Sequence, residues 1–475
     1  MRVILISLLI VLVSCGKSDT EKPNILFLFA DDQTYQGVHA LGNDEVITPS
    51  LDKLVEEGVT FTHTYNMGAW NGAVCVASRA MLNTGRMLWR AHAAEKNYEN
   101  LKDSRHFWAQ RMEDAGYDTY MTGKWHVKMG ADKLFNTTNH IRPGMPGTVM
   151  SAYDRPLSKD DTEWLPWDTA NGGFWKGGKH WSEIVADDAL NFLASASESE
   201  SPFFMYIAFN APHDPRQSPK EYVDMYPVDD ILIPESFLPE YPYKDYIGCS
   251  EKLRDEMLAP FPRTKYSIQV HRQEYYAIIS HMDTQIGRIL EGLEKSGKAK
   301  NTYIFFSADH GLAVGHHGLV GKQNLFDHSV RVPLMIVGPD IPKNKKRDQQ
   351  VYLQDIMASS LDLAGYENPA FVEFNSLIPM VHKKNQDSPY NSIYGAYLML
   401  QRSIRTDQYK LIFYPQAQKV LLFDLDKDPE EMHNLAEEKE FHDVVKKLAN
   451  DLRVLQIEMD DPIDISEVFP VYFQN

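Results

Sequence analysis

The sequence predicts an α/β fold built on one large, mostly parallel sheet, and two observations predict it. Several short apolar runs have the length of buried strands, and amphipathic helical segments lie between many of them. This alternation is typical of parallel sheets that are covered by helices. With 475 residues, 43% of them hydrophobic, the chain can bury one large core and a smaller one beside it.

The predicted elements follow in order along the chain. The apolar runs predict strands at 24–30, 58–65, 117–122, 202–209, 302–308 and 332–338. Helical spacing predicts helices at 48–58, at 104–116 and, over a long amphipathic stretch, from about 273 to 297. From about residue 375 the pattern changes: "SIRTDQYKLIFY" and "KVLLFDL" predict antiparallel strands, and "FHDVVKKLANDLRVLQIEM" predicts a helix.

Polar side chains cluster directly after four of the predicted strands. The clusters are Asp31 and Asp32; Lys124 and His126; His213 and Asp214; and Asp309 and His310. Each cluster alone is most simply an ordinary loop, because charged residues normally lie in connections. Ligands of open α/β sheets, however, bind outside the carboxyl ends of the strands. If these strands are parallel, the four clusters meet at one edge, and we expect a functional site there.

The clustered groups fall into two chemical kinds. Asp31, Asp32 and Asp309 offer hard oxygen ligands, which suit calcium or magnesium, and His310 could complete the shell. The second kind supplies positive charge and proton transfer. It comprises Lys124, His126 and His213 from the clusters, with Arg79 and Lys322 from elsewhere in the chain. Together they suit a substrate that carries a small tetrahedral oxyanion. For each histidine alone the alternative is a hydrogen-bonded structural residue, as most of the 17 must be.

Net charge and the first residues bear on location and partners. The formal charge of −18 speaks against general adhesion to nucleic acid or to anionic membranes. The leading segment "MRVILISLLIVLVSCG" has a positive start and an apolar run too short for a comfortable membrane span. It predicts a lipoprotein signal peptide at 1–14, lipidation of Cys15, and a tether at 15–22. We therefore expect an exported bacterial lipoprotein, anchored to the membrane in the periplasm or at the cell surface. An ordinary secretory signal with an incidental cysteine is the alternative.

Two further cysteines would remain in such an exported protein, Cys75 and Cys249. Cys75 lies in "AVCVASRAMLNTG", just ahead of an arginine-bearing segment that has the pattern of a helix start. A disulfide between the two cysteines is one interpretation. A thiol with a chemical fate would instead have to stay free, and spacing alone leaves both interpretations open.

The segment "CVASR", with "TG" five residues further on, resembles the signature of the type I, formylglycine-dependent sulfatases of the alkaline-phosphatase-like superfamily. The resemblance continues over nearly the whole mature chain, through "NILFLFADDQ", "TGKWH", "APHDP", "ADHG", "GKQNLFDHSVRVPL" and "FDLDKDPEEMHNLA". It implies a sulfuric ester hydrolase with a catalytic domain at 23–374, on a large mixed sheet flanked by helices. A smaller α+β domain on an antiparallel sheet is implied at 375–475.

The resemblance also implies how the nucleophile and the metal are held. Cys75 is oxidised to formylglycine by a maturation enzyme, and the hydrate of that aldehyde is the nucleophile, favoured by its place at a helix start. Arg79 holds the hydrate. A calcium ion is bound by Asp31, Asp32, the modified Cys75, Asp309 and His310.

Sulfate binding and proton transfer follow from the same resemblance. Lys124 and Lys322 bind sulfate oxygens. His213, together with Lys322, protonates the departing alcohol oxygen, and His126 takes a proton from the hydrate so that sulfate is expelled.

A few positions depart from the family pattern or stay without a role. Ala77 stands where proline is commoner, which bears on how efficiently Cys75 is converted. His310 stands where asparagine is common, which weakens the choice of calcium. His316 and His317 in "GHHG" receive no role.

The substrate is predicted by analogy. An exported bacterial sulfatase is expected to act on sulfated carbohydrate, with algal polysaccharide (ulvan- or carrageenan-like) ahead of glycosaminoglycan. The aromatic-rich stretches 136–181 and 216–262 could stack on sugar rings, although half or more of such side chains serve local packing. Asp214 and Arg216 are the expected contacts to the sugar.

Two other functions remain open. A phosphodiester or phosphonate hydrolase of the same superfold would share part of the nucleophile motif. A surface glycan-binding protein that no longer performs chemistry would keep an unmodified thiol at Cys75.

Overall fold

A computed structural model describes residues 21–144 and 149–473 of the chain. The predicted signal peptide, Cys15 and most of the predicted tether lie outside these residues, so those predictions stay untested. Among the described residues, no helix combines the length and the apolar character that a membrane crossing requires.

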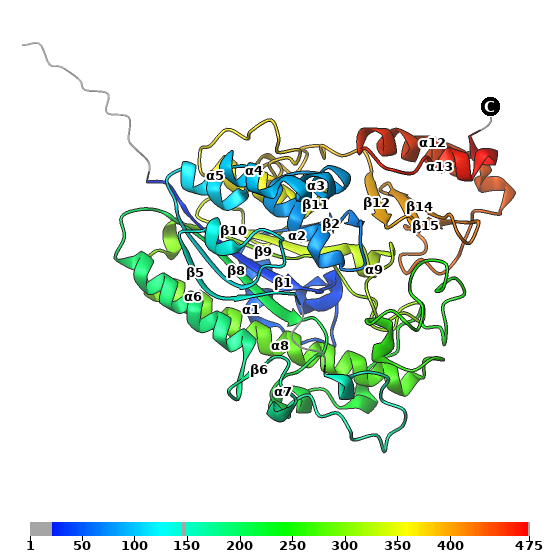
Figure 1. The fold of residues 1–475 in the computed structure, drawn as a ribbon, viewed down its shortest axis with the longest axis horizontal. Coiled ribbons are helices and arrows are strands. Elements are labelled where there is room, and N and C mark those ends of the chain that lie inside the picture. Colours follow the sequence, from blue (N-terminus) through cyan, green and yellow to red (C-terminus); the bar gives the residue numbers. More distant parts are fainter. Residues whose placement is uncertain (1–20, 145–148, 474–475) are drawn as a thin grey trace, which may run out of the picture.

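One large sheet of eight strands organises the molecule (Figure 1). In spatial order its strands are β11 (Lys345–Tyr352), β2 (Val59–Tyr65), β10 (Arg331–Val337), β9 (Thr302–Ala308), β1 (Asn24–Asp31), β8 (Phe203–Pro212), β4 (Asp118–Lys124) and β5 (Thr137–Arg142). Only β10 runs antiparallel to its neighbours, and every other pair in the sheet is parallel. The predicted mostly parallel sheet is therefore confirmed.

The centre of this sheet is buried on both faces. Every residue of β1, β8 and β9 is buried. Strands covered on both faces have continuous apolar runs without polar alternation, because neither face meets water. That is why "NILFLF", "FFMYIAF" and "TYIFF" could be assigned from the sequence alone.

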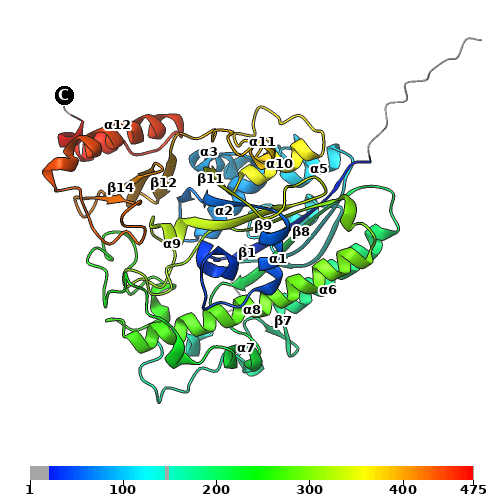
Figure 2. The ribbon, with the colours of Figure 1, turned by 180° about the vertical axis from the view of Figure 1, so that it is seen from behind.

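Helices cover the two faces of the sheet (Figures 1 and 2). One face carries α1 (Pro49–Glu57), α6 (Trp181–Ser197) and α8 (Lys265–Lys295). The other carries α2 (Val74–Thr84), α3 (Leu88–Ala94), α4 (Tyr98–Asp103), α5 (Trp108–Asp114) and α10 (Asp355–Leu363). Short helices in the connections are α7 (Lys220–Asp224), α9 (Asp327–Val330) and α11 (Ile378–His382), and a small hairpin pairs β6 (Trp175–Lys176) with β7 (Lys179–His180).

The long helix α8 begins at Lys265, eight residues before its predicted start at about residue 273. Its N-cap is Thr264, whose hydroxyl accepts a hydrogen bond from the Ser267 amide at 3.0 Å. The first turns mix buried and exposed residues less regularly than the rest of the helix, which is why the apolar period located the start too late.

A second, smaller sheet of five strands lies beside the first (Figure 1). Its order is β15 (Lys419–Asp424), β14 (Tyr409–Tyr414), β13 (Gln401–Arg405), β12 (Ile393–Tyr397) and β3 (Gly68–Ala69), with α12 (His442–Glu458) and α13 (Ile465–Val468) packed nearby. The four C-terminal strands are antiparallel, as predicted. β3 joins β12 in parallel, so a segment just before Cys75 is part of the second sheet.

Candidate active site

The polar clusters that follow β1, β4, β8 and β9 meet at the carboxyl edge of the large sheet. Because these four strands are mutually parallel neighbours, their ends lie side by side. One ligand atom from each of Asp31, Cys75, Asp309 and His310 lies within 4.8 Å of the others. A second such group consists of Asp31, Asp32 and His213. The structure thus brings the sequence-predicted metal ligands together.

Three carboxylates form the centre of the site, and solvent reaches none of them. Asp31, Asp32 and Asp309 are each 0% exposed. The Asp32 amide donates a hydrogen bond to Asp309 Oδ1 at 3.1 Å, and the His310 amide donates to the same oxygen at 3.0 Å. His310 Nε2 lies 3.0 Å from Asp32 Oδ1.

Buried cations surround these carboxylates. Arg79 Nε donates to Asp309 Oδ2 at 2.9 Å, and its Nη1 donates to the Lys124 carbonyl at 2.7 Å. The Lys124 ammonium is bonded to Asp31. Lys322 Nζ donates to both oxygens of Asp32, at 3.0 and 2.8 Å. Cationic side chains from α2, β4 and residues 321–323 thus compensate the negative charge of the carboxylates.

Cys75 occupies the second position of α2, where the partial positive charge of the helix start favours an anion. Its Sγ lies 3.2 Å from His126 Nδ1. Burial alone would raise the pKa of this thiol, but Lys124, Lys322 and the hydrogen bonds from His126 and His310 outweigh burial and hold it well below its ordinary value. The site therefore stabilises negative charge at position 75.

The two described cysteines are not joined. Both Cys75 and Cys249 are free and buried. Cys249 Sγ points instead to the carbonyl oxygen of Gln323, at 3.2 Å. The interpretation of the pair as a disulfide is wrong, and the thiol at position 75 remains available for chemistry.

Two site residues hold left-handed backbone conformations. Asp32 has a φ of 69° and His126 a φ of 56°, and each directly follows the end of a strand or lies two residues beyond it. Such a conformation costs a non-glycine residue roughly 1–2 kcal/mol. The chain turns sharply at these points, and the turn directs both side chains into the site.

The electrostatics of the carboxylates favour an added cation. Burial, with a further contribution from Asp309, raises the pKa of Asp31 well above its ordinary value, despite Lys124 and Arg79. Burial would also raise the pKa of Asp309, but Arg79, His310 and Lys124 hold it well below the usual range. Asp31 Oδ1 makes no hydrogen bond to any described residue. A hard divalent ion, which prefers carboxylate oxygens, fits this donor set.

His213 lies on the other side of Asp32. Its Nε2 is 2.8 Å from Lys322 Nζ and 3.6 Å from Asp32 Oδ2. Its Nδ1 is 2.8 Å from Asp214 Oδ1. The imidazole and the Lys322 ammonium therefore stand together at one side of the carboxylate cluster, as a pair that could serve a leaving group.

The two residues predicted to contact the sugar are both buried. Asp214, 2% exposed, is bonded to His213 and accepts a hydrogen bond from the Tyr153 hydroxyl at 3.1 Å. Arg216, also 2% exposed, donates to His271 Nδ1 at 3.1 Å. Contact with substrate stays a prediction for both, but the observed contacts of Asp214 are those of a support for His213.

Some residues around the site gave no signal in the sequence. Tyr153 comes from the aromatic-rich stretch before α6, and Asp255 from the stretch before α8. Asp255 Oδ2 lies 3.8 Å from Lys322 Nζ and accepts from Gln323 Nε2 at 2.8 Å. Their places depend on the path of long connections, which no local pattern reports.

His316 and His317 pack against the C-terminal part. His316 Nδ1 lies 2.8 Å from Ser236 Oγ and 3.2 Å from Glu430 Oε2. The His317 ring stacks on Phe326 at 4.1 Å between centroids, and its Nε2 lies 3.1 Å from the Glu431 carbonyl. These contacts account for both side chains as packing residues.

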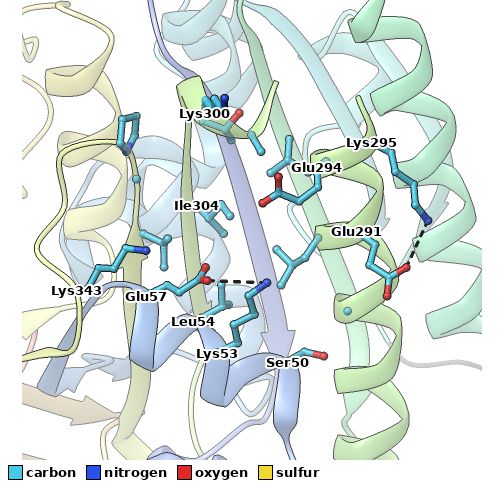
Figure 3. A pocket seen from close by; sticks show the side chains of 18 of the residues that line it. Ser50, Lys53, Leu54, Glu57, Glu291, Glu294, Lys295, Lys300, Ile304 and Lys343 are labelled. Atoms are coloured by element: carbon cyan, nitrogen blue, oxygen red, sulfur yellow. Dashed lines mark hydrogen bonds and ion pairs between the residues drawn. The ribbon is translucent and has the colours of Figure 1, made fainter. Parts of the chain in front are cut away.

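A large hollow lies at the opposite, amino edge of the sheet (Figure 3). Its volume is about 720 Å³, and it opens between α1, the end of α8 and the start of β9. Leu54 and Ile304 lie in it, and charged side chains line its rim. Four of these charged side chains form two ion pairs, Lys53–Glu57 at 3.9 Å and Lys295–Glu291 at 3.5 Å, and the charges within each pair cancel. The hollow has none of the predicted catalytic residues, so the site is assigned by chemistry and not by size.

Two family models match the chain. The model described as Sulfatase matches residues 23–366. The model described as N-sulphoglucosamine sulphohydrolase, C-terminal, matches residues 315–458. The first match includes every residue of the candidate site described above.

Similar proteins cover nearly the whole chain. An arylsulfatase of Clostridium perfringens is 29% identical over 90% of this chain and 93% of its own length. An N-acetylglucosamine-6-O-sulfatase of Bacteroides thetaiotaomicron is 25% identical, with 95% and 89% covered. An ulvan-active sulfatase of Formosa agariphila is 26% identical, with 94% and 83% covered.

Solved structures share the fold. One, of a protein in complex with its substrate D-glucosamine-2-N,6-O-disulfate, has a TM-score of 0.73 and 22% identity, covering 93% of this chain and 99% of that one. A phosphonate monoester hydrolase from Silicibacter pomeroyi has a TM-score of 0.74 and 19% identity, with 93% and 96% covered. At these identities the likeness shows a shared fold alone.

Proposed function

The chain belongs to the Sulfatase family and is a sulfuric ester hydrolase, and on that premise we propose that it removes sulfate from a sulfated carbohydrate through an oxidised Cys75. The observation that carries this proposal is the position of Cys75. It lies at a helix start, 3.2 Å from a histidine nitrogen, with Lys124 and Lys322 close enough to depress the pKa of its thiol. An oxygen nucleophile formed at this position would gain the same stabilisation.

We propose that the oxidised form of Cys75 is formylglycine, made by a maturation enzyme. The hydrate of that aldehyde would supply the hydroxyl that attacks sulfur. Arg79 supports this proposal, because its guanidinium is fully buried one helical turn beyond Cys75 and is fixed to Asp309 and to the Lys124 carbonyl. A buried, immobile guanidinium orients an oxygen without having to reorganise during the reaction.

The residues that would hold calcium are Asp31, Asp32, Asp309, His310 and the modified Cys75. The clustering of these ligand atoms and the buried Oδ1 of Asp31, which has no hydrogen-bond partner among the described residues, support this choice. When bound, the ion would supply positive charge that polarises a sulfate oxygen. The three nearby cations, Arg79, Lys124 and Lys322, suit the sulfate group of an ester in the same space.

Proton transfer would be divided between two histidines on opposite sides of the cluster. His126 Nδ1 faces position 75 and is placed to accept a proton from the nucleophile's second hydroxyl. Burial lowers the pKa of His126, which keeps the imidazole neutral and able to act as a base. His213 Nε2 and Lys322 Nζ, 2.8 Å apart, would serve the departing alcohol oxygen.

For the substrate we propose a sulfated sugar, with ulvan- or carrageenan-like algal polysaccharide ahead of glycosaminoglycan. The named relatives support a carbohydrate, since they include an ulvan-active sulfatase and an N-acetylglucosamine-6-O-sulfatase. The tryptophans of the aromatic-rich stretch add little, because Trp164 is buried and Trp167, Trp175 and Trp181 are half-buried. We further propose that Cys15 is lipidated and anchors the protein to a membrane, in the periplasm or at the cell surface.

Phosphonate or phosphodiester hydrolysis is the second candidate function. The observation in favour of this function is that a phosphonate monoester hydrolase has the same fold. Sulfate and phosphonate monoesters are both tetrahedral oxyanions, so the fold and the cationic side chains alone do not separate them.

The experiment that tests the proposal joins mass and activity on one preparation. The protein is produced with and without a formylglycine-generating enzyme, and the peptide that contains Cys75 is weighed. We expect the aldehyde mass and 4-nitrophenyl sulfate hydrolysis to appear together, and both to be absent from a Cys75→Ala variant. Matched assays with a phosphonate monoester and a phosphodiester compare the two candidate functions.

Three outcomes would overturn the proposal. Hydrolysis of the sulfate ester by protein with an unmodified thiol at position 75 would show that formylglycine is not required. Preference for the phosphonate or the phosphodiester would move the chain to the second candidate function. Binding of sulfated glycan without turnover, by protein that carries the aldehyde, would leave a glycan-binding protein.

A further inference from the structure

The carboxylate of Asp214 is buried beside a catalytic candidate and faces away from solvent. Asp214 Oδ1 lies 2.8 Å from His213 Nδ1, and the Asp214 carbonyl oxygen lies 2.9 Å from the same nitrogen. Two oxygens therefore face one ring nitrogen. Since oxygen atoms of a carboxylate and a carbonyl can only accept, Nδ1 must carry a hydrogen and donate it.

The other ring nitrogen is left for chemistry. With Nδ1 as the donor, His213 Nε2 is the nitrogen that faces Lys322 Nζ and Asp32. Without a partner at Nδ1, the ring could turn about its bonds or exchange the two nitrogens. The contacts of Asp214 therefore decide which nitrogen faces the reacting atoms.

Asp214 is itself held from two directions. The Tyr153 hydroxyl donates to Oδ2 at 3.1 Å, and Arg254 Nε lies 3.9 Å from the same oxygen. Arg254 is in turn fixed by Asp255, whose Oδ1 accepts from Arg254 Nη2 at 2.8 Å. Tyr153 follows a short 3-10 helix (Met150–Ala152) in the long stretch before α6, so an excursion from the fold supports the ring of His213.

We propose that Asp214 is a positioning residue, which fixes the ring of His213 through Nδ1 so that Nε2 meets the departing alcohol oxygen, and that Tyr153 holds Asp214 in place. This inference rests on the proposed function. As the ester S–O bond breaks, its electron pair stays on the alcohol oxygen, and sulfur bonds to the nucleophile at position 75. The alcohol oxygen takes the proton that Nε2 carries in the doubly protonated ring, and the ring is left neutral. The Nδ1 proton stays in its hydrogen bond to Asp214.

A positioning role predicts a loss that depends on the leaving group. A nitrophenolate departs without needing a proton, whereas an alkoxide from a sugar or a simple alkyl ester does need one. General acid catalysis contributes about 10²–10⁴-fold where it is required. For Asp214→Asn we therefore expect kcat/KM to fall about 100-fold for an alkyl sulfate and less than about threefold for 4-nitrophenyl sulfate.

The experiment measures kcat/KM for wild type and Asp214→Asn over a series of aryl and alkyl sulfates. A steeper dependence on leaving-group basicity in the variant supports the inference. An equal loss for every ester would overturn it, because a merely structural residue would affect all substrates alike. If wild type hydrolyses none of the sulfates, the proposed function fails instead, and the two failures are thereby distinguished.

Asp188→Asn is the matched control. Asp188 is a buried carboxylate that also pairs with a histidine, His140, at 2.9 Å, but it bonds to Thr122 and Asn139 and not to the site. Any loss in this variant should be the same for all leaving groups. A leaving-group dependence that matched that of Asp214→Asn would overturn the inference.

Tyr153→Phe keeps the inference testable if Asp214→Asn does not fold. It removes one hydrogen bond to Asp214 and leaves the carboxylate in place. We expect the same selective loss, about 3- to 10-fold for the alkyl sulfate, since one hydrogen bond is worth about 1 kcal/mol. Unchanged selectivity in folded Tyr153→Phe would contradict the role given to this tyrosine, and unchanged selectivity in both variants would overturn the whole inference.

Discussion

Asp31, Asp32 and Asp309 show at the residue scale why this site is costly to build. Moving each ionised carboxylate from water to the protein interior without a partner costs several kcal/mol of solvation free energy. Arg79 and the two lysines compensate part of this cost through the ion pairs described above. The pKa of Asp31 is raised by burial and by Asp309 despite Lys124 and Arg79, which indicates that these ion pairs compensate the cost only in part. A bound divalent ion would therefore stabilise the fold as well as the reaction.

Calcium is expected to raise the thermal unfolding temperature of the wild-type protein. A ligand at a hundredfold excess over its Kd stabilises the folded state by about 2.7 kcal/mol. Asp309→Asn should lose most of this rise, because it removes a carboxylate from the centre of the ligand group. The measurement is calorimetry of protein stripped with a chelator and then titrated with calcium.

Asp188→Asn serves again as the control, and it should keep the full calcium response. The assignment of the metal ligands fails if Asp309→Asn responds as the wild type does. It fails equally if millimolar calcium leaves the wild-type unfolding temperature unchanged.

At the scale of elements, the predictable strands are those covered on both faces. β1, β8 and β9 are continuous apolar runs, and their positions follow from composition. The edge strands β5 and β11 have the sequences "TTNHIR" and "KKRDQQVY", which alternate poorly and carry charge. Polar edges protect a sheet from pairing with other chains, and the same polarity hides them from a search for apolar runs. β3, with two residues, is too short for any pattern.

Gly68 in β3 is expected to be intolerant of a side chain. Its φ is 93°, and a Cβ there would lie 2.0 Å from the Ala396 carbonyl oxygen of β12. Gly68→Ala must push the two strands apart, and we expect a loss of about 2–4 kcal/mol in the free energy of unfolding. Urea unfolding of the variant and the wild type measures this loss.

Gly116→Ala separates the clash from the cost of the backbone conformation. Gly116 has a similar φ of 88°, but nothing lies within 4 Å of its Cβ position. This control should lose only about 1–2 kcal/mol, the cost of a left-handed residue. Equal losses in the two variants would mean that β3 and β12 do not form a close, rigid pair.

For the whole molecule, the location of the site was predictable because the topology of parallel strands collects their polar ends at one edge. Asp31, Lys124, His213 and Asp309 could be assigned to that edge from four strands alone. The supports behind them could not, since Tyr153 and Asp255 arrive on long connections. The contact of Tyr153 with Asp214 and that of Asp255 with Lys322 depend on the complete fold.

The net charge of −18 predicts an unusual dependence on salt. A polysulfated substrate approaches a protein of the same sign, and repulsion extends about 30 Å at 0.01 M salt but about 8 Å at 0.15 M. We expect kcat/KM for a polysulfated oligosaccharide to rise about three- to tenfold across this range. For a substrate with a single sulfate the change should stay below about twofold.

The measurement is initial rates at low substrate concentration with an inert monovalent salt and constant calcium. A fall in kcat/KM with salt for the polysulfated substrate would show that a local cationic surface, and not the total charge, governs the approach.

β1 runs from the amino edge of the large sheet at Asn24 to the carboxyl edge at Asp31, over about 25 Å. The chain enters this strand at the amino edge, where the Lys22 carbonyl accepts a hydrogen bond from Asn301 Nδ2 at 3.2 Å. A lipid on Cys15, seven residues upstream of Lys22, would therefore attach the protein to the membrane from the amino edge of the sheet, opposite the candidate site. The candidate site, at the carboxyl edge of the sheet, would then lie on the side of the protein that faces away from the bilayer, where large polymers could reach it.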